Sequence, residues 1–191
     1  MKIVGVGVSE GMLTEEAIRA IDGAEVIYGS KRAIEIASSY IKCETHEIDF
    51  KHLDEIPDDA VVLSTGDPML SGLGTLLRGE VIPGISSLQL ACARLKIDLT
   101  SITAITAHGR DIEASKKRIL DEAGRGRYLF ILPDPKRFGS IEISKILLEA
   151  GYELPVVVLE NLGYENEKIR YGSTQNPPEP ETMLYVMVVH P

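Results

Sequence analysis

A short apolar run that opens into a glycine- and proline-rich stretch is the feature that most restricts how this chain can fold. Residues 60–63 have the composition of a buried strand, and residues 64–74 follow as Ser-Thr-Gly-Asp-Pro-Met-Leu-Ser-Gly-Leu-Gly. Gly66 can take backbone angles closed to other residues, and Pro68 fixes its own φ. In isolation, Gly-Asp-Pro indicates an ordinary turn between a strand and a helix. Beside similar loops, it indicates the ligand-binding edge of an α/β sheet.

Two helix starts are predicted near this edge. Ser71 and Gly72 are expected to begin a short helix that runs to Leu77, with free N–H groups facing the loop. A second loop, residues 83–87, reads Pro-Gly-Ile-Ser-Ser and precedes an apolar helix that extends to Leu95. Its two serines can cap that helix and face a ligand at once, because the two roles are compatible. The loop lacks the Gly-x-Ser-x-Gly pattern of a nucleophilic serine.

The first strand, residues 2–8, also ends in glycines, since residues 5–11 read Gly-Val-Gly-Val-Ser-Glu-Gly. A dinucleotide fingerprint would need glycine at position 10 and an acidic residue near positions 29–30. The chain has Glu10 and Gly-Ser there, so a Rossmann cofactor is not predicted. Helices alternate with strands through the first half of the chain, which favours a mainly parallel sheet.

The second half begins again after a junction near residue 100. Two helices are expected at 112–123 and 140–150, and the strands at 102–106, 128–132, 155–159, 167–171 and 183–190. The last three strands have no helices between them, so part of this sheet is antiparallel. The predicted fold is therefore α/β, with an N-terminal domain at 1–100 and a C-terminal domain with a mixed sheet at 101–191.

Composition excludes several classes of function. A net charge of −9, no Trp and 5% aromatic residues argue against nucleic-acid binding. Cys43 and Cys92 stand far apart, so neither a disulfide framework nor a zinc site is expected. No apolar run reaches the length of a membrane span, and no signal peptide is evident. A cytoplasmic protein with no membrane or metal site is expected.

The order of these loops resembles the tetrapyrrole methylase family of S-adenosylmethionine-dependent enzymes over essentially the whole chain. The motifs that carry the resemblance are Gly5-x-Gly7 with Leu13-Thr14, Gly66-Asp67-Pro68 with Ser71-Gly72, and Pro83 to Ser87. A subgroup of corrin-ring C5-methyltransferases is similar at Val26 to Arg32, His108-Gly109-Arg110 and Glu160 to Gly163. Many relatives have Gly-Pro-Gly-Asp after the first strand, where this chain has Val8-Ser9-Glu10-Gly11.

The resemblance implies two α/β domains with S-adenosylmethionine in a cleft between them, in a homodimer that acts on a corrinoid. Carried over by position, the cofactor-binding residues are Thr65, Gly66, Asp67, Leu70, Ser71, Gly72, Ser86, Ser87, Leu132 and Leu162. For both leucines, core packing is the alternative. Some relatives carry a fused domain for decarboxylation and C15 methylation. This chain ends at Pro191, so a separate protein is expected to do that work.

Methyl transfer requires that two reactants be positioned in a dry site, and it needs no metal. The candidates for a base are Asp67, His108 and Glu160, and none is assigned because none has the spacing of a dyad or triad. Two other functions stay open: a diphthine synthase-like protein methyltransferase, and a metabolite-binding module without turnover.

Basic residues concentrate in one segment of this acidic chain. Residues 108–137 hold eight basic and five acidic side chains, a net charge of +3. Lysines on a helix there can simply face solvent. Arg110 follows a strand and a glycine, where a guanidinium can bind a carboxylate through two parallel hydrogen bonds. Lys31, Arg32, His108 and Arg110 are therefore the predicted substrate-binding residues.

Overall fold

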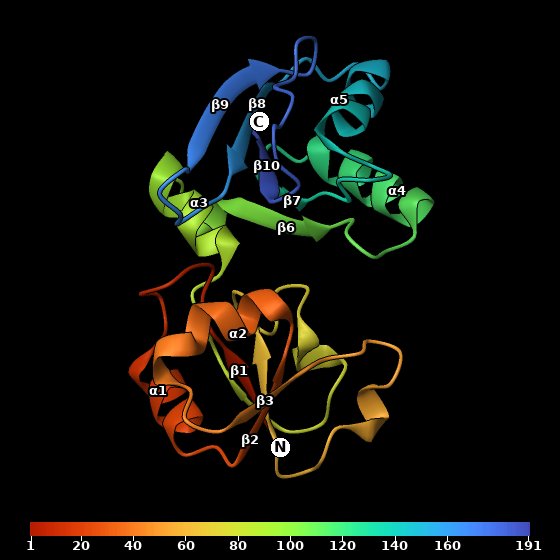
Figure 1. Ribbon diagram of the computed structural model, residues 1–191. Coiled ribbons are helices and arrows are strands. Elements are labelled where there is room, and N and C mark those ends of the chain that lie inside the picture. Colours follow the sequence, from red (N-terminus) through yellow and green to blue (C-terminus); the bar gives the residue numbers. More distant parts are fainter. The chain divides into compact units, whose positions relative to one another are not determined.

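The computed structural model describes all residues, 1–191, and the chain divides into two compact units. The first unit is Met1–Ser87 and the second is Leu88–Pro191. Each has its own sheet, as Figure 1 shows. The two units meet at the start of helix α3, Ser87–Leu95. The domain boundary near residue 100 remains a prediction.

The first unit is built on a five-stranded parallel sheet in the order β3-β2-β4-β1-β5. Its strands are β1 (Lys2–Gly5), β2 (Val26–Gly29), β3 (Glu44–Glu47), β4 (Val61–Ser64) and β5 (Glu80–Ile82). All strands of a parallel sheet end at the same edge, so the loops after β1, β4 and β5 meet there, because β1 lies between β4 and β5. The predicted parallel sheet is confirmed.

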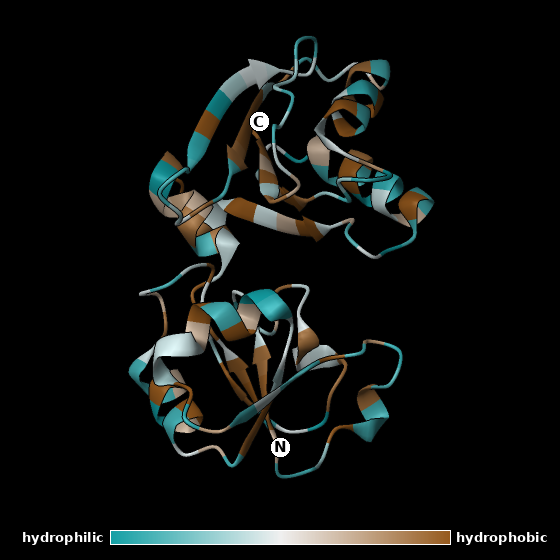
Figure 2. Cartoon of the chain, in the orientation of Figure 1, coloured by the Kyte–Doolittle hydropathy of each residue, from teal (hydrophilic) through white to brown (hydrophobic).

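Two helices cover one face of this sheet. Helix α1 (Glu15–Asp22) begins at Thr14, whose hydroxyl accepts the N–H of Ala17, and α2 (Lys31–Ala37) begins at Ser30. Such caps satisfy N–H groups that have no partner within the helix. The buried residues of both helices pack on Val4, Val61 and Leu63 of the central strands. Figure 2 shows the apolar residues gathered on the inner strands.

The opposite face is covered by short elements instead of long helices. The 3-10 turns on this face are η2 (Leu53–Glu55) and η3 (Leu73–Thr75), whose Leu53 and Leu73 pack with residues of the central strands. A third turn, η1 (Ser38–Tyr40), follows α2 and packs on the helical face through Tyr40. The helix predicted from Ser71 to Leu77 is wrong, because only the turn η3 forms there. Ser71 adopts φ 58°, a left-handed conformation that cannot continue into an α-helix, and it separates η3 from the preceding loop.

The second unit is built on a five-stranded mixed sheet in the order β6-β7-β10-β8-β9. Its strands are β6 (Ile102–Thr106), β7 (Tyr128–Leu132), β8 (Pro155–Glu160), β9 (Lys168–Ser173) and β10 (Tyr185–Val189). Strands β6 and β7 are parallel, and the remaining pairs are antiparallel. The predicted mixed sheet is therefore confirmed.

Helices α4 (Ile112–Ala123) and α5 (Ser140–Glu149) pack on one face of this sheet. Their apolar residues, Ile119, Ile143 and Leu147 among them, are fully buried. The turn η4 (Leu99–Ser101) precedes β6. None of the helices combines the length and the apolar character needed to cross a membrane.

Candidate functional site

Three loops at the carboxyl edge of the first sheet are joined by their backbones. The N–H of Gly66 donates to the carbonyl of Gly7 at 2.7 Å, and the N–H of Gly7 donates to the carbonyl of Gly66 at 3.2 Å. This isolated antiparallel bridge ties the loop after β1 to the loop after β4. Gly66 adopts φ 67°, which is unfavourable for other residues.

The carboxylate of Asp67 joins the loops after β4 and β5. One oxygen accepts the N–H of Met69 at 2.7 Å, and the other accepts the N–H of Gly84 at 3.1 Å, 17 residues further along the chain. Both oxygens therefore bind backbone donors, and ionised carboxylates hold such donors strongly. This arrangement makes Asp67 a support for the loops and leaves it poorly suited to act as a base.

Glycines allow the three loops to approach closely. A Cβ atom on Gly84 would lie 2.2 Å from the carbonyl oxygen of Gly66, and one on Gly5 would lie 2.6 Å from the nitrogen of Gly84. Atoms cannot approach so closely without moving the backbone. The Cα of Ser86 lies near Gly66, 3.8 Å from the position of an added Cβ. The structure thus brings Gly66, Asp67 and Ser86 together, as the sequence predicted.

The other candidates in the first unit lie on these same loops. Ser86 is buried, Thr65, Leu70, Gly72 and Ser87 are half-buried, and Ser71 is exposed. A sheet edge made of glycine backbone and serine hydroxyls offers hydrogen-bond donors and acceptors at close range. It can therefore hold the polar groups of a ligand.

Arg32 has a structural contact that the sequence did not indicate. Its Nη2 donates to the carbonyl of Val8 at 3.0 Å, which fastens the loop after β1 to the start of α2. Lys31, the first residue of that helix, is exposed. Substrate binding by Lys31 and Arg32 remains a prediction.

In the second unit, the loop after β6 is attached to the end of β7. The carbonyl of Leu132 accepts the N–H groups of Ala107 at 2.8 Å and His108 at 3.1 Å. Leu132 is half-buried, whereas His108 and Arg110 are exposed. The structure therefore places one predicted substrate residue, His108, beside one predicted cofactor residue, Leu132.

Sequence analysis missed an acidic residue at this same sheet edge. Asp134 is 7% exposed and accepts Nε and Nη2 of Arg137 at 3.0 and 2.7 Å. The hydrogen bonds from Arg137 hold the pKa of the Asp134 carboxyl below its ordinary value, and the charge of His108 acts in the same direction. A turn signal was present in Pro-Asp-Pro, but nothing in the sequence showed that Asp134 binds an arginine.

The last two candidates lie at the end of β8. Glu160 is fully buried and Leu162 is 6% exposed, and Asn161 between them adopts φ 49°. Both oxygens of Glu160 accept hydrogen bonds, from Arg170 and from two backbone N–H groups. Glu160 is therefore poorly suited to act as a base. Leu162 is separated from Leu132 by strand β10 in the sheet order.

Comparisons with known proteins identify the family of this chain. A family model described as Tetrapyrrole (Corrin/Porphyrin) Methylases matches residues 2–177. A curated relative, the probable cobalt-precorrin-7 C(5)-methyltransferase of Methanocaldococcus jannaschii, is 36% identical in an alignment that covers 90% of this chain and 88% of that protein.

Solved structures of tetrapyrrole-modifying enzymes are also similar to this chain. The precorrin-6Y methylase of Archaeoglobus fulgidus has a TM-score of 0.74 and 33% identity, and the match covers 100% of this chain and 97% of that one. Uroporphyrin-III C-methyl transferase from Thermus thermophilus, solved with S-adenosyl homocysteine, shares the fold with a TM-score of 0.79 at 19% identity, covering 99% and 96%. With its matching family model and these full-length relatives, the chain belongs to the tetrapyrrole (corrin/porphyrin) methylase family.

Proposed function

We propose that the protein transfers a methyl group from S-adenosylmethionine to C5 of precorrin-7 or its cobalt form, in the synthesis of the corrin ring. The observation that carries this proposal is the 36% identity to a probable cobalt-precorrin-7 C(5)-methyltransferase across nine tenths of the chain. The 33% identity to a precorrin-6Y methylase across the whole chain supports the same assignment.

The loops of the first unit fit the proposed cofactor. S-adenosylmethionine supplies an electrophilic methyl group on a sulfonium, and the rest of the molecule is a nucleoside joined to an amino acid. Gly66 to Leu70, with Ser71, Gly72, Ser86 and Ser87, would hold it through backbone groups and hydroxyls. Leu132 and Leu162 of the second unit would contact the adenine. This role for each residue is part of the proposal.

The protein's task in this reaction is to position the reactants. The receiving carbon belongs to an electron-rich bridge of the macrocycle, so the protein need not supply a nucleophile, and orientation supplies most of the acceleration. Asp67 and Glu160 already accept two or more hydrogen bonds each. Of the three candidates for a base, only His108 is exposed, so we propose it as the one that could accept a proton from the substrate.

A methyl-transfer assay tests the proposed function. Purified protein, S-adenosylmethionine and precorrin-7, with and without cobalt, should yield a product heavier by one methyl group in mass spectrometry. Loss of carbon dioxide in the same product would contradict the assignment, since it indicates the C15 reaction as well. Labelling of translation elongation factor alone would favour the diphthine synthase alternative. Cofactor binding without any transfer would favour the metabolite-binding module.

Replacing Arg110 by alanine should weaken corrinoid binding by roughly 10- to 150-fold and leave the affinity for the cofactor unchanged. A charge-assisted contact to a substrate carboxylate is worth about 1.5 to 3 kcal/mol, and Arg110 is exposed beside the His108 loop. The loss should shrink as salt rises, because ions screen the contact that is removed. Visible absorption of the corrinoid measures the binding.

Arg125→Ala is a suitable control, because Arg125 is an exposed arginine of the same unit that contacts Asp121 and Glu122 near the end of α4. Equal affinities of the Arg110 and Arg125 variants at low salt would show that Arg110 is only a surface charge.

We also infer that the enzyme works in the cytoplasm as a homodimer and relies on a separate protein for C15 methylation and decarboxylation. The relative from Methanocaldococcus jannaschii supports the separate protein, since it is named for the C(5) reaction alone and the match covers 88% of it. The 34% identical Mycobacterium tuberculosis protein, named precorrin-6Y C(5,15)-methyltransferase [decarboxylating], is covered to only 51%. Light scattering at micromolar concentration should give twice the chain mass of 20.9 kDa.

A further inference from the structure

We propose that Glu160 is a positioning residue for the cofactor, acting through the turn at residues 161–167 that contains Leu162. This inference rests on the proposed function, because it assumes that Leu162 contacts S-adenosylmethionine. Its evidence lies entirely within the second unit.

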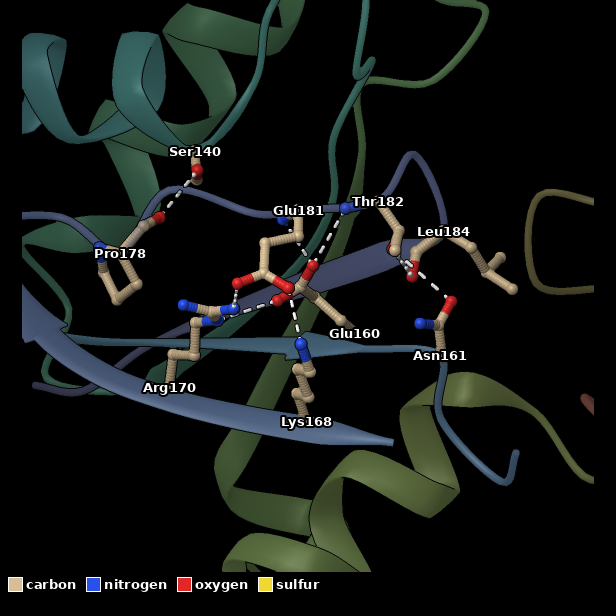
Figure 3. Close-up of polar contacts among 9 residues, drawn as sticks. All are labelled: Ser140, Glu160, Asn161, Lys168, Arg170, Pro178, Glu181, Thr182 and Leu184. Atoms are coloured by element: carbon tan, nitrogen blue, oxygen red, sulfur yellow. Dashed lines mark hydrogen bonds and ion pairs between the residues drawn. The ribbon is translucent and has the colours of Figure 1, made fainter. Parts of the chain in front are cut away.

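Glu160 fastens the end of β8 to the segment that precedes β10. One carboxylate oxygen accepts the N–H groups of Glu181 at 2.6 Å and Thr182 at 3.0 Å, and the other accepts Nε of Arg170 at 2.9 Å. The Glu160 side chain is fully buried, so each contact replaces one with water. Figure 3 shows these donors converging on Glu160 from β9 and from the segment at 181–182.

A second layer of charge holds the donors in place. Glu181 forms ion pairs with Arg170 and Lys168, both from the edge strand β9. Arg170 thus bridges a buried carboxylate and an exposed one, and it is 34% exposed itself. Buried charges require partners of this kind, because an unpaired one is very unfavourable. The layer keeps Arg170 oriented toward Glu160.

The turn after Glu160 is closed on itself. Asn161 adopts φ 49°, and its N–H donates to the carbonyl of Leu184 at 2.9 Å, while its own carbonyl accepts the N–H of Tyr164 at 3.0 Å. A left-handed conformation at a residue other than glycine persists only where neighbouring contacts hold it. The contacts of Glu160 and Asn161 supply that restraint, so the backbone of Leu162 has a fixed direction.

Glu167 holds the far end of the turn. Its carboxylate accepts the N–H of Gly163 at 2.7 Å and binds Arg94 of α3 through two hydrogen bonds, at 2.6 and 3.3 Å. Burial raises the pKa of the Glu167 carboxyl, but the hydrogen bonds from Arg94 and Gly163 outweigh it and hold that pKa below its ordinary value. Leu162 therefore lies between two fixed carboxylates, Glu160 before it and Glu167 after it.

The contacts that hold this turn all come from the protein itself. A preformed binding surface avoids the entropy that ordering a loop would cost during association. Loosening either end should therefore reduce the affinity for S-adenosylmethionine, while the reaction of the bound cofactor is unaffected. A base would behave differently, because its loss lowers kcat.

The test compares three variants of the full chain in cofactor binding, kinetics and hydrogen exchange. Glu160→Gln places an amide N–H₂ against Arg170 or against the backbone donors, whichever way it turns. Arg94→Met removes the ion pair with Glu167 at the other end of the turn. Because the Arg94 side chain is 39% exposed, this variant should fold even if Glu160→Gln does not. Glu149→Gln is the matched control, since it removes an exposed carboxylate of α5 in the same unit, whose ion pair with Lys145 lies outside this cluster.

We expect Glu160→Gln and Arg94→Met to raise the Kd and KM for S-adenosylmethionine by about tenfold at unchanged kcat, with faster exchange at residues 161–167. Glu149→Gln should stay within about twofold of the wild type. Wild-type affinities and KM in both test variants would overturn the inference, as would a fall in kcat with KM unchanged. A wild-type protein that fails to bind S-adenosylmethionine would overturn the proposed function itself, and the cofactor role of Glu160 with it.

Discussion

Replacing Gly84 by alanine should destabilise the first unit by about 3 kcal/mol or more, enough to lower the temperature of unfolding by several degrees. The added Cβ would lie 2.2 Å from the carbonyl oxygen of Gly66 and 2.8 Å from the carbonyl carbon of Gly5. Both are backbone atoms of the three packed loops, so they cannot relieve the clash by a change of rotamer, as a side chain could. Urea unfolding monitored by circular dichroism measures the change.

Gly23→Ala is the control for this effect. Gly23 ends α1 at φ −92°, an angle that other residues adopt. A Cβ atom on Gly23 would lie 3.5 Å from the carbonyl oxygen of Arg19, which is an ordinary van der Waals distance. It should change the free energy of unfolding by less than about 1 kcal/mol. Equal stabilities of the two variants would mean that the loops after β1, β4 and β5 do not pack as described.

Replacing Asp67 by leucine should weaken S-adenosylmethionine binding about 100-fold. The carboxylate holds the N–H groups of Met69 and Gly84, and two hydrogen bonds to a charged acceptor are together worth about 3 kcal/mol or more. Their loss frees the loops after β4 and β5 from each other at the proposed site. The half-buried side chain leaves the core untouched, so the free energy of unfolding should fall by at most about 2 kcal/mol.

Isothermal titration calorimetry with S-adenosylmethionine and its demethylated product measures the effect. Asp59→Leu is the matched control, because Asp59 is an exposed carboxylate of the same unit, just before β4. Asp67→Asn, which keeps one acceptor oxygen, should fall between the control and Asp67→Leu. Full affinity in a folded Asp67→Leu variant would remove the cofactor site from these loops.

Much of this fold could be read from local patterns. Thr14 and Ser30 cap the helices that they precede, and buried strands of β-branched residues lie close to where composition placed them. The carboxyl edge of the first sheet follows from strand order, so Gly66 and Ser86 could be placed together. The helix expected after Ser71 does not form, because Ser71 itself adopts a left-handed backbone conformation. That conformation depends on contacts across the loop, which local helix propensity does not describe.

Long-range partners could not be predicted from the sequence. Glu167 binds an arginine 73 residues earlier in the chain, and Asp67 binds a backbone N–H 17 residues later. Neither separation has a local signature, since such pairs depend on how strands are ordered in the sheet. From the sequence alone, Asp67 and Glu160 are therefore both candidates for a base. Their roles as supports for loops became evident only from the structure.

The strand order also has a consequence for how the chain folds during synthesis. Strand β1 pairs with β4 and β5, whose residues follow it by about 60 and 80 positions, so its partners emerge from the ribosome long after it does. In the second sheet, β8 and β9 are joined by a short turn and pair at once. Closing long loops slows folding, and pairing between neighbours speeds it. The apolar β1 strand must therefore remain unpaired until residue 64 has been made, and its side chains are exposed to water during this interval.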